Sequence, residues 1–226
     1  MNTEVNAFRR GAICGALLLA AATGCSEDPG AAVAGEPVSP SPSAASQEPS
    51  ETPGGSKDPQ AADIPLARNL DANASSPMWA FPVLVTGWSQ ATLDQGGVNQ
   101  LKKDGIEATF TSYQLVQDVG GGADAANSKA YLVDFASQLS RNSQIEEVST
   151  PKLSTTTIDS DRGALEFVQQ DLTYTTTDGT TYRSRYLARS VDTYVLAVQY
   201  AGPEPDWSER EWTTLLDAGL SAVLGV

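Results

Sequence analysis

The stretches GALEFVQQDLTYTT (163–176) and TYRSRYLARS (181–190), separated by the pair Asp178-Gly179, decide the fold of this chain. Both stretches have the length of a strand, and Asp-Gly between two such runs is typical of a tight β-hairpin turn. A further run over 193–201 has apolar residues at successive positions, as in a strand that is covered on both faces. The sequence therefore predicts three consecutive antiparallel strands.

Helical patterns flank these predicted strands. A helix is expected to start at the acidic segment 206–209, which has the form of a capping box, and to stop at Gly225. A second helix is expected over 127–140, where apolar residues recur at helical spacing. Earlier strands are expected over 83–90 and 106–117.

The run 145–158 is rich in Thr and Val, but Pro151 interrupts it, which predicts an edge strand or two short strands. Together with the other patterns it indicates an α+β domain. In this prediction an antiparallel β-sheet is flanked by helices.

The first 24 residues have the pattern of a secretory signal. Arg9 and Arg10 precede an apolar run over 11–21, and Ala22-Thr23-Gly24-Cys25 has the form of a lipobox. The apolar run has about half of the roughly 20 residues needed to span a bilayer, so we expect it to be cleaved. The pattern resembles that of bacterial lipoproteins, which implies diacylglycerol attachment to Cys25 and a lipid anchor on the extracytoplasmic face of the cell membrane. An ordinary secretory signal with a chance cysteine is the alternative.

The composition changes after Cys25. Residues 26–62 contain seven of the thirteen prolines and no aromatic residue, a composition typical of a disordered spacer. The expected organisation is a signal peptide at 1–24, a lipidated cysteine with its tether at 25–62, and a single domain at 63–226.

Charge and residue types limit the function. The segment 63–226 carries 21 acidic and 11 basic residues, a net charge of −10, which argues against nucleic acid as a partner. The chain has no histidine, which excludes Ser-His-Asp catalysis and His-ligated metal sites. Cys14 lies in the signal and Cys25 would be acylated, so we expect no disulfide in the domain. We also expect no cofactor, no metal site and no enzymatic activity.

Arg183, Arg185 and Arg189 are the candidate binding residues, together with Tyr174. The period of two in a strand places the three arginines on one face, as a basic stripe in an acidic domain. With a two-residue turn at Asp178-Gly179, Tyr174 would lie opposite Arg183. Such a stripe could bind an anionic partner. The alternative is that the arginines pair with local carboxylates and cover apolar surface.

The order of the elements is similar to that of mycobacterial LpqN-type lipoproteins, which have the PsbP-like fold. The resemblance also rests on Trp88 after Thr86-Gly87, on the run Tyr186-Leu187-Ala188-Arg189, and on Gly202-Pro203 before the last helix. It covers about residues 79–224 and implies an α/β/α sandwich in an actinobacterial envelope protein. Family members are mostly non-enzymatic partners of larger assemblies. The resemblance therefore implies that the domain binds another cell-envelope protein.

Two other functions stay open at the level of the sequence. A carrier of lipids or other amphiphiles would need an apolar cavity between sheet and helix. A hydrolase of wall glycan would need two carboxylates that converge in a cleft, for instance Glu166 and Asp171 as acid and base.

Overall fold

The computed structural model describes residues 63–71, 76–116 and 122–225. All of them lie within one compact unit. The predicted signal peptide, Cys25 and the predicted tether lie outside the described residues. In the described part of the chain, no helix is long and apolar enough to cross a bilayer.

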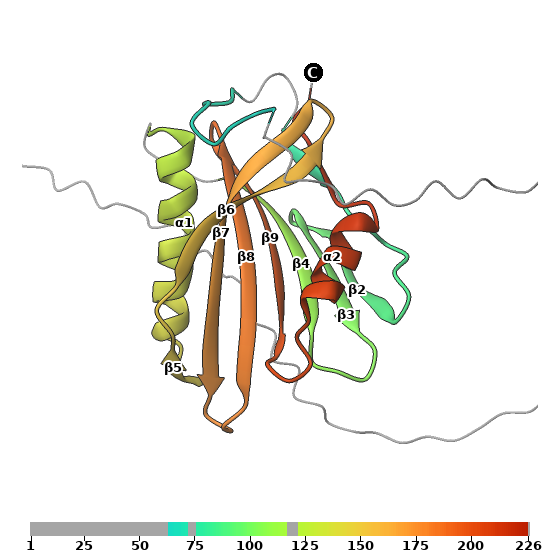
Figure 1. The fold of residues 1–226 in the computed structure, drawn as a ribbon, viewed down its shortest axis with the longest axis vertical. Helices are drawn as coiled ribbons and strands as arrows, with labels where there is room; N and C mark the ends of the chain where they lie inside the picture. The colour runs from blue at the N-terminus through green and yellow to red at the C-terminus, as the bar shows by residue number, and fades with distance from the viewer. Residues whose placement is uncertain (1–62, 72–75, 117–121, 226) are drawn as a thin grey trace, which may run out of the picture. The chain divides into compact units, whose positions relative to one another are not determined.

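Within these residues the chain forms ten strands and two helices. In chain order they are β1 (Met78–Ala80), β2 (Trp88–Gln95), β3 (Val98–Lys103), β4 (Thr109–Val116), α1 (Asp124–Ser140), β5 (Ile145–Val148), β6 (Lys152–Ser160), β7 (Gly163–Thr176), β8 (Thr181–Val191), β9 (Tyr194–Pro203), α2 (Glu209–Asp217) and β10 (Ser221–Val223). Nine strands form one sheet in the order β1-β10-β6-β7-β8-β9-β4-β3-β2, and β5 pairs with β7 off this path (Figure 1). The contact of β10 with β6 is parallel, and the other strand pairs are antiparallel.

The expected α/β/α sandwich is wrong, because the described protein is mostly β and its sheet curls into a half-barrel (Figure 1). β1 and β4 are far apart in the strand order, yet the indole Nε1 of Trp79 donates to the Tyr113 carbonyl at 3.1 Å. The curl brings these strands together across its inner face. A layer of helices does not fit there, and only the nine residues of α2 lie over this face.

Aromatic side chains fill the inner face of the curled sheet. Trp79 stacks on Phe167 with the ring centres 5.5 Å apart, and Tyr200 stacks on Trp207 at 5.3 Å. Trp212 of α2 packs edge-on against Phe110. This inner core belongs to one apolar cluster that includes residues from β1 to β10. The ring contacts join strands that are distant in the sequence.

The outer face of the sheet is covered by α1. The helix packs mainly against β8, with β5 and β7 beside it. Leu132 of α1 is fully buried among Val168, Tyr186 and Val195 of the sheet. The predicted helix over 127–140 is therefore confirmed as α1, with a start three residues earlier than expected.

The last predicted helix starts two residues after the position expected from an acidic cap at Asp206, and it ends early. The Ser208 hydroxyl caps α2 by accepting from the Glu211 N–H at 3.1 Å. The helix stops at Asp217, because Gly219 has a φ of +111°, a conformation that is strained for residues with a Cβ and typical of helix ends. The chain then forms β10, which pairs with β1.

The predicted strands over 163–176 and 181–190 are confirmed as β7 and β8, but the turn between them has three residues instead of two. The Gly179 N–H donates to the Thr176 carbonyl at 2.8 Å, and the Thr176 N–H donates to the Thr180 carbonyl at 3.0 Å. Gly179 has a φ of +85°. This is a tight turn followed by a left-handed glycine, the common form of a three-residue hairpin loop.

The extra loop residue shifts the register by one position. Thr173 lies opposite Arg183, and Asp171 lies opposite Arg185. The expected pairing of Tyr174 with Arg183 is therefore wrong, because directly opposite residues share a face and Tyr174 now faces the other side of the sheet.

The run over 145–158 forms two short strands, β5 and β6, as the sequence predicted, and both pair with β7. The strand expected over 83–90 is mostly wrong, because β2 begins only at Trp88. The strand expected over 106–117 is confirmed as β4. β1, β3 and β10 were not expected from the sequence.

Buried tyrosines on the two faces predict how stability depends on alkaline pH. Burial raises the pKa of Tyr174 and of Tyr200 to about 12 each, from about 10 in an unfolded chain. Because the pKa of each phenol is higher in the folded state than in the unfolded chain, the neutral phenols contribute fully to the stability of the fold below pH 10. This contribution is lost as the pH rises through 12. We expect the free energy of unfolding to fall steeply over that interval, with tyrosinate absorbance appearing together with loss of the circular dichroism signal. Tyr200→Phe should make the fall shallower, whereas titration of these phenols near pH 10 in folded protein would contradict their burial.

Candidate functional site

The three predicted arginines lie on the inner face of β8, but they differ in exposure. Arg189 is fully buried and Arg185 is 8% exposed, whereas Arg183 is only half-buried. The basic stripe is therefore mostly internal. Arg183 is the member that keeps part of its side chain accessible.

Arg185 connects the sheet to α2. Its Nε donates to the Asp171 carboxylate at 2.7 Å, and its Nη1 donates to the Glu209 carboxylate in the first turn of the helix. The guanidinium also lies 5.2 Å from the ring centre of Trp207 and 5.7 Å from that of Trp212. Burial lowers the pKa of Arg185, but the hydrogen bonds to the two carboxylates outweigh this effect and raise it. Arg185 thus holds α2 in place over the inner face.

Arg183 stacks on Trp207, with its guanidinium carbon 3.8 Å from the ring centre. A cation over an indole face at this distance is attracted by the ring. Among the described residues, Arg183 makes no salt bridge. Its guanidinium donors are therefore free of carboxylates of the described chain, unlike those of Arg185.

Arg189 lies where β7 and β8 separate. The pairing of these strands ends at Val168 and Ala188. Beyond this point the segment at Ile64 takes the place of β8 and pairs with Leu165 of β7. A buried wedge is left between the two strands, and the side chain of Arg189 fills it.

The Arg189 guanidinium satisfies backbone carbonyls that surround this wedge. Its Nη2 donates to the carbonyls of Arg68 and Pro65, and its Nη1 donates to the carbonyl of Glu166 at 3.4 Å. The carboxylate of Asp124, the first residue of α1, lies 3.9 Å from Nη2. Arg189 thereby joins the sheet, α1 and the entering chain.

Tyr174 lies on the outer face and does not join the arginines. Its ring stacks on Tyr182 with the centres 5.3 Å apart. The structure therefore brings Arg183 and Arg185 together over Trp207, and it places Arg189 and Tyr174 elsewhere.

The carboxylates considered for glycan hydrolysis do not converge. Glu166 accepts from the Leu66 N–H at 2.7 Å, while Asp171 pairs with Arg185. The two residues are five positions apart on β7, so their side chains point to opposite faces of the sheet. In the part of the chain that the structure describes, no group of His, Cys, Asp or Glu side chains is arranged to hold a metal ion.

An apolar loop between β1 and β2, packed against the core at both ends, is the feature that the sequence analysis missed. The ring of Phe81 stacks on Phe110 with the centres 5.5 Å apart, and Pro82 is buried. At the other end of the loop Val85 packs against the inner core, and its carbonyl accepts from the Trp88 N–H at 3.0 Å. Both ends are fixed, so the residues between them are held outward. Pro82 interrupts the apolar run 81–85. It was the available signal that this run is not a regular strand.

Comparisons with known proteins identify no family. No family model matches the chain, and no curated protein matches it. Among solved structures, the chain is similar to PA94 from Pseudomonas aeruginosa, a protein of unknown function, with 15% identity and a TM-score of 0.36 over 57% of this chain and 91% of that one. It is also similar to a protein from Bacteroides thetaiotaomicron VPI-5482, with 13% identity and a TM-score of 0.31 over 60% of this chain and 41% of that one. The chain thus spans less than half of the Bacteroides protein.

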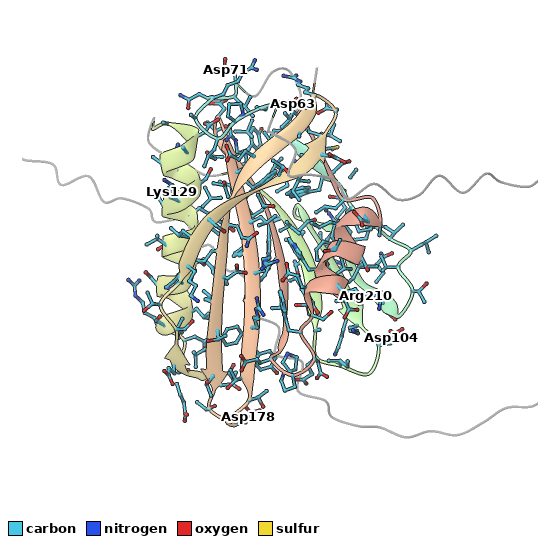
Figure 2. The ribbon with its side chains drawn as sticks, viewed as in Figure 1. Asp63, Asp71, Asp104, Lys129, Asp178 and Arg210 are labelled. Atoms are coloured by element: carbon cyan, nitrogen blue, oxygen red, sulfur yellow. The ribbon has the colours of Figure 1, made fainter. Side chains whose placement is uncertain are left out.

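The environment of Arg189 predicts a structural role. Arg189→Met would leave the buried Asp124 carboxylate without its cation and several carbonyls without a donor. We expect a loss of about 3 kcal/mol in the free energy of unfolding, measured by urea denaturation. The matched control is Arg210→Met on the exposed side of α2 (Figure 2), which should change stability by less than about 0.5 kcal/mol. A loss below about 1 kcal/mol for Arg189→Met would contradict the role described here.

Proposed function

We propose that this protein is a lipoprotein, anchored through Cys25 on the extracytoplasmic face of the cell membrane, whose folded domain binds another cell-envelope protein without catalysis. The lipobox at 22–25 supports the anchor. The apolar loop between β1 and β2 supports binding.

The exposure of Leu84 is the observation on which the proposed binding function rests. Leu84 is 93% exposed and its neighbour Val83 is 45% exposed. Full burial of a leucine side chain contributes roughly 1.5–3 kcal/mol. Because both ends of the loop already pack against the core, a partner that covers Leu84 would have less of the loop to order. A partner that covers this apolar pair would remove its surface from water, which favours binding.

The charge of the domain favours a protein partner over a lipid surface. The segment 63–226 has a net charge of −10, and bilayers with anionic lipids attract basic segments. The filling of the inner face by stacked rings also favours a protein-binding role over a carrier role. Arg183 remains a second candidate contact, since the residue is partly exposed and makes no salt bridge with the described residues. The hydrolase alternative loses its candidate pair, because Glu166 and Asp171 face opposite sides.

The anchor is tested by removing the thiol. Cys25→Ala should move the protein from the membrane fraction to the soluble fraction, because the acyl chains that hold it would not be attached. Cys14→Ala is the matched control, since it changes a cysteine of the same signal outside the lipobox, and it should leave the protein in the membrane fraction. Tight membrane association of the Cys25→Ala chain would contradict the proposal.

The binding surface is tested by in-cell crosslinking followed by mass spectrometry. We expect a specific envelope protein to be captured by the wild type and to fall at least about tenfold with Leu84→Asp, because burying the new charge opposes contact. Leu153→Asp on β6 is the control, because it places the same charge at another exposed leucine, which is 45% exposed, and it should leave capture unchanged.

Two results would contradict the proposed binding surface. One is equal capture by wild type and Leu84→Asp when circular dichroism shows both to be folded. The other is recovery of lipid alone, which would favour the carrier function.

A further inference from the structure

One edge of the sheet has no neighbouring strand along most of β6. β10 pairs with β6 at a single position, Ala222 with Ser160, and β5 pairs with β7 instead. Residues 152–155 of β6 are exposed. We call the stretch 153–157 the β6 edge. It lies beside β7 on one side, and no strand of the described chain accompanies it on the other.

The backbone of the β6 edge directs hydrogen-bonding groups away from the sheet. The N–H of Asp161, just after β6, donates to the Ala222 carbonyl at 3.1 Å, so this residue points away from β7. Backbone groups alternate in direction along a strand, and the N–H and carbonyl groups of Leu153, Thr155 and Thr157 therefore also point away from β7. None of these groups has a hydrogen-bond partner among the described residues.

The other edges of the sheet carry features that oppose strand pairing. β2 shifts its register twice against β3, and Asp94 within it has a φ of +48°. β1 has three residues, and β5 has four, with a register shift and two glutamates. Bulges, charges and short strands are the means by which proteins protect an edge. β6 instead keeps one register with β7 over all of its nine residues, so the β6 edge is long, regular and unprotected.

The side chains of the β6 edge suit a strand as the partner. Residues 154–157 read Ser-Thr-Thr-Thr, and threonine is enriched in strands. Threonine and serine side chains can hydrogen-bond across two paired strands. The nearest charges along β6 are Lys152 and Asp159, one beyond each end of the edge. A row of unpaired backbone groups beside such side chains favours an extended strand that adds to the sheet.

We propose that two copies of this chain pair through their β6 edges, as antiparallel strands about a two-fold axis at Thr155. Thr155 would lie opposite Thr155 of the other copy. Ser154 would lie opposite Thr156 of the other copy, and Leu153 opposite Thr157. The members of each pair are an even number of residues apart, so each face of one sheet continues into the same face of the other.

A second copy satisfies the β6 edge in a way that follows from its own sequence. The two edges have equal length and each supplies the partners that the other lacks, as in an isologous two-fold contact. Antiparallel pairing places the Lys152 side chains of the two copies at opposite ends, so they do not face each other. An axis at Thr156 would set Leu153, which is 45% exposed, opposite Asp159. The axis at Thr155 avoids this apolar–charged pair.

The test is a charge swap at Thr155, measured by energy transfer between dyes. The acylated full-length chain is labelled with a donor or an acceptor and mixed in detergent with micelles in excess over chains. We expect saturable transfer between wild-type copies. Thr155→Lys on both copies, or Thr155→Asp on both, should weaken association at least about threefold, because like charges would lie directly opposite at the axis. Thr155→Lys mixed with Thr155→Asp should associate within about twofold of the wild type, because opposite charges across a strand pair attract.

Thr213→Lys is the matched control. It makes the same change at an exposed threonine of α2, and it should leave association unchanged. The thermal transition of each Thr155 variant, followed by circular dichroism, should also be unchanged, because Thr155 is exposed. Association of the mixed variants would further show that both are folded.

The proposal is overturned if wild-type copies show no saturable transfer, if the Thr155→Lys copies associate as the wild type does, or if Thr213→Lys weakens association as much. It is also overturned if the mixed variants do not associate, because the β6 edge would then contact something other than its own copy, such as a strand of another protein.

The pairing of copies goes beyond the proposed protein contact, which lies on the β1–β2 loop, and the two proposals fail separately. Leu84→Asp should leave the association of copies intact, and Thr155→Lys should leave capture of the envelope protein intact. Leu153→Asp stays a control for that capture, because Leu153 lies on the β6 edge and not on the loop.

Discussion

The register between β7 and β8 determines which side chains meet on each face of the sheet. The three-residue loop after Thr176 places Asp171 opposite Arg185 on the inner face. Arg185 then reaches both Asp171 and Glu209, which fixes α2 over the aromatic core. With a loop one residue shorter, Leu172 would take that place and Asp171 would point to the other face, because a slip by one residue reverses every side chain of a strand. The buried Arg185 would then lack its partner on the sheet.

The curl of the sheet depends on a second buried arginine. β7 cannot follow β8 over its whole length and also pair with the entering segment at Ile64, so the two strands separate. Such a split exposes backbone carbonyls inside the protein, where an unpaired polar group is costly. Arg189 supplies several donors from one side chain, and Asp124 lies near enough to balance its charge. Two of the three arginines that look like a basic surface in the sequence thus have carboxylate partners inside the protein, whereas Arg183 is partly exposed and makes no salt bridge with the described residues.

Local patterns predicted the elements better than they predicted the architecture. β7 and β8 follow from the Asp178-Gly179 turn between them, β9 from its continuous apolar run and α1 from helical spacing. The start of α2 was predicted less well, because Ser208 and not the expected acidic residue Asp206 caps the helix. The curl follows from pairings between distant residues, such as Trp79 with Ala222 and Ile64 with Leu165, for which no local pattern exists. The expected pairing of Tyr174 with Arg183 was wrong for a smaller reason, since one residue in the loop decides whether the two side chains share a face. The apolar run at Val83 and Leu84 led to the prediction of a strand. The run is a loop instead, and contacts with Phe110 and the inner core hold its ends.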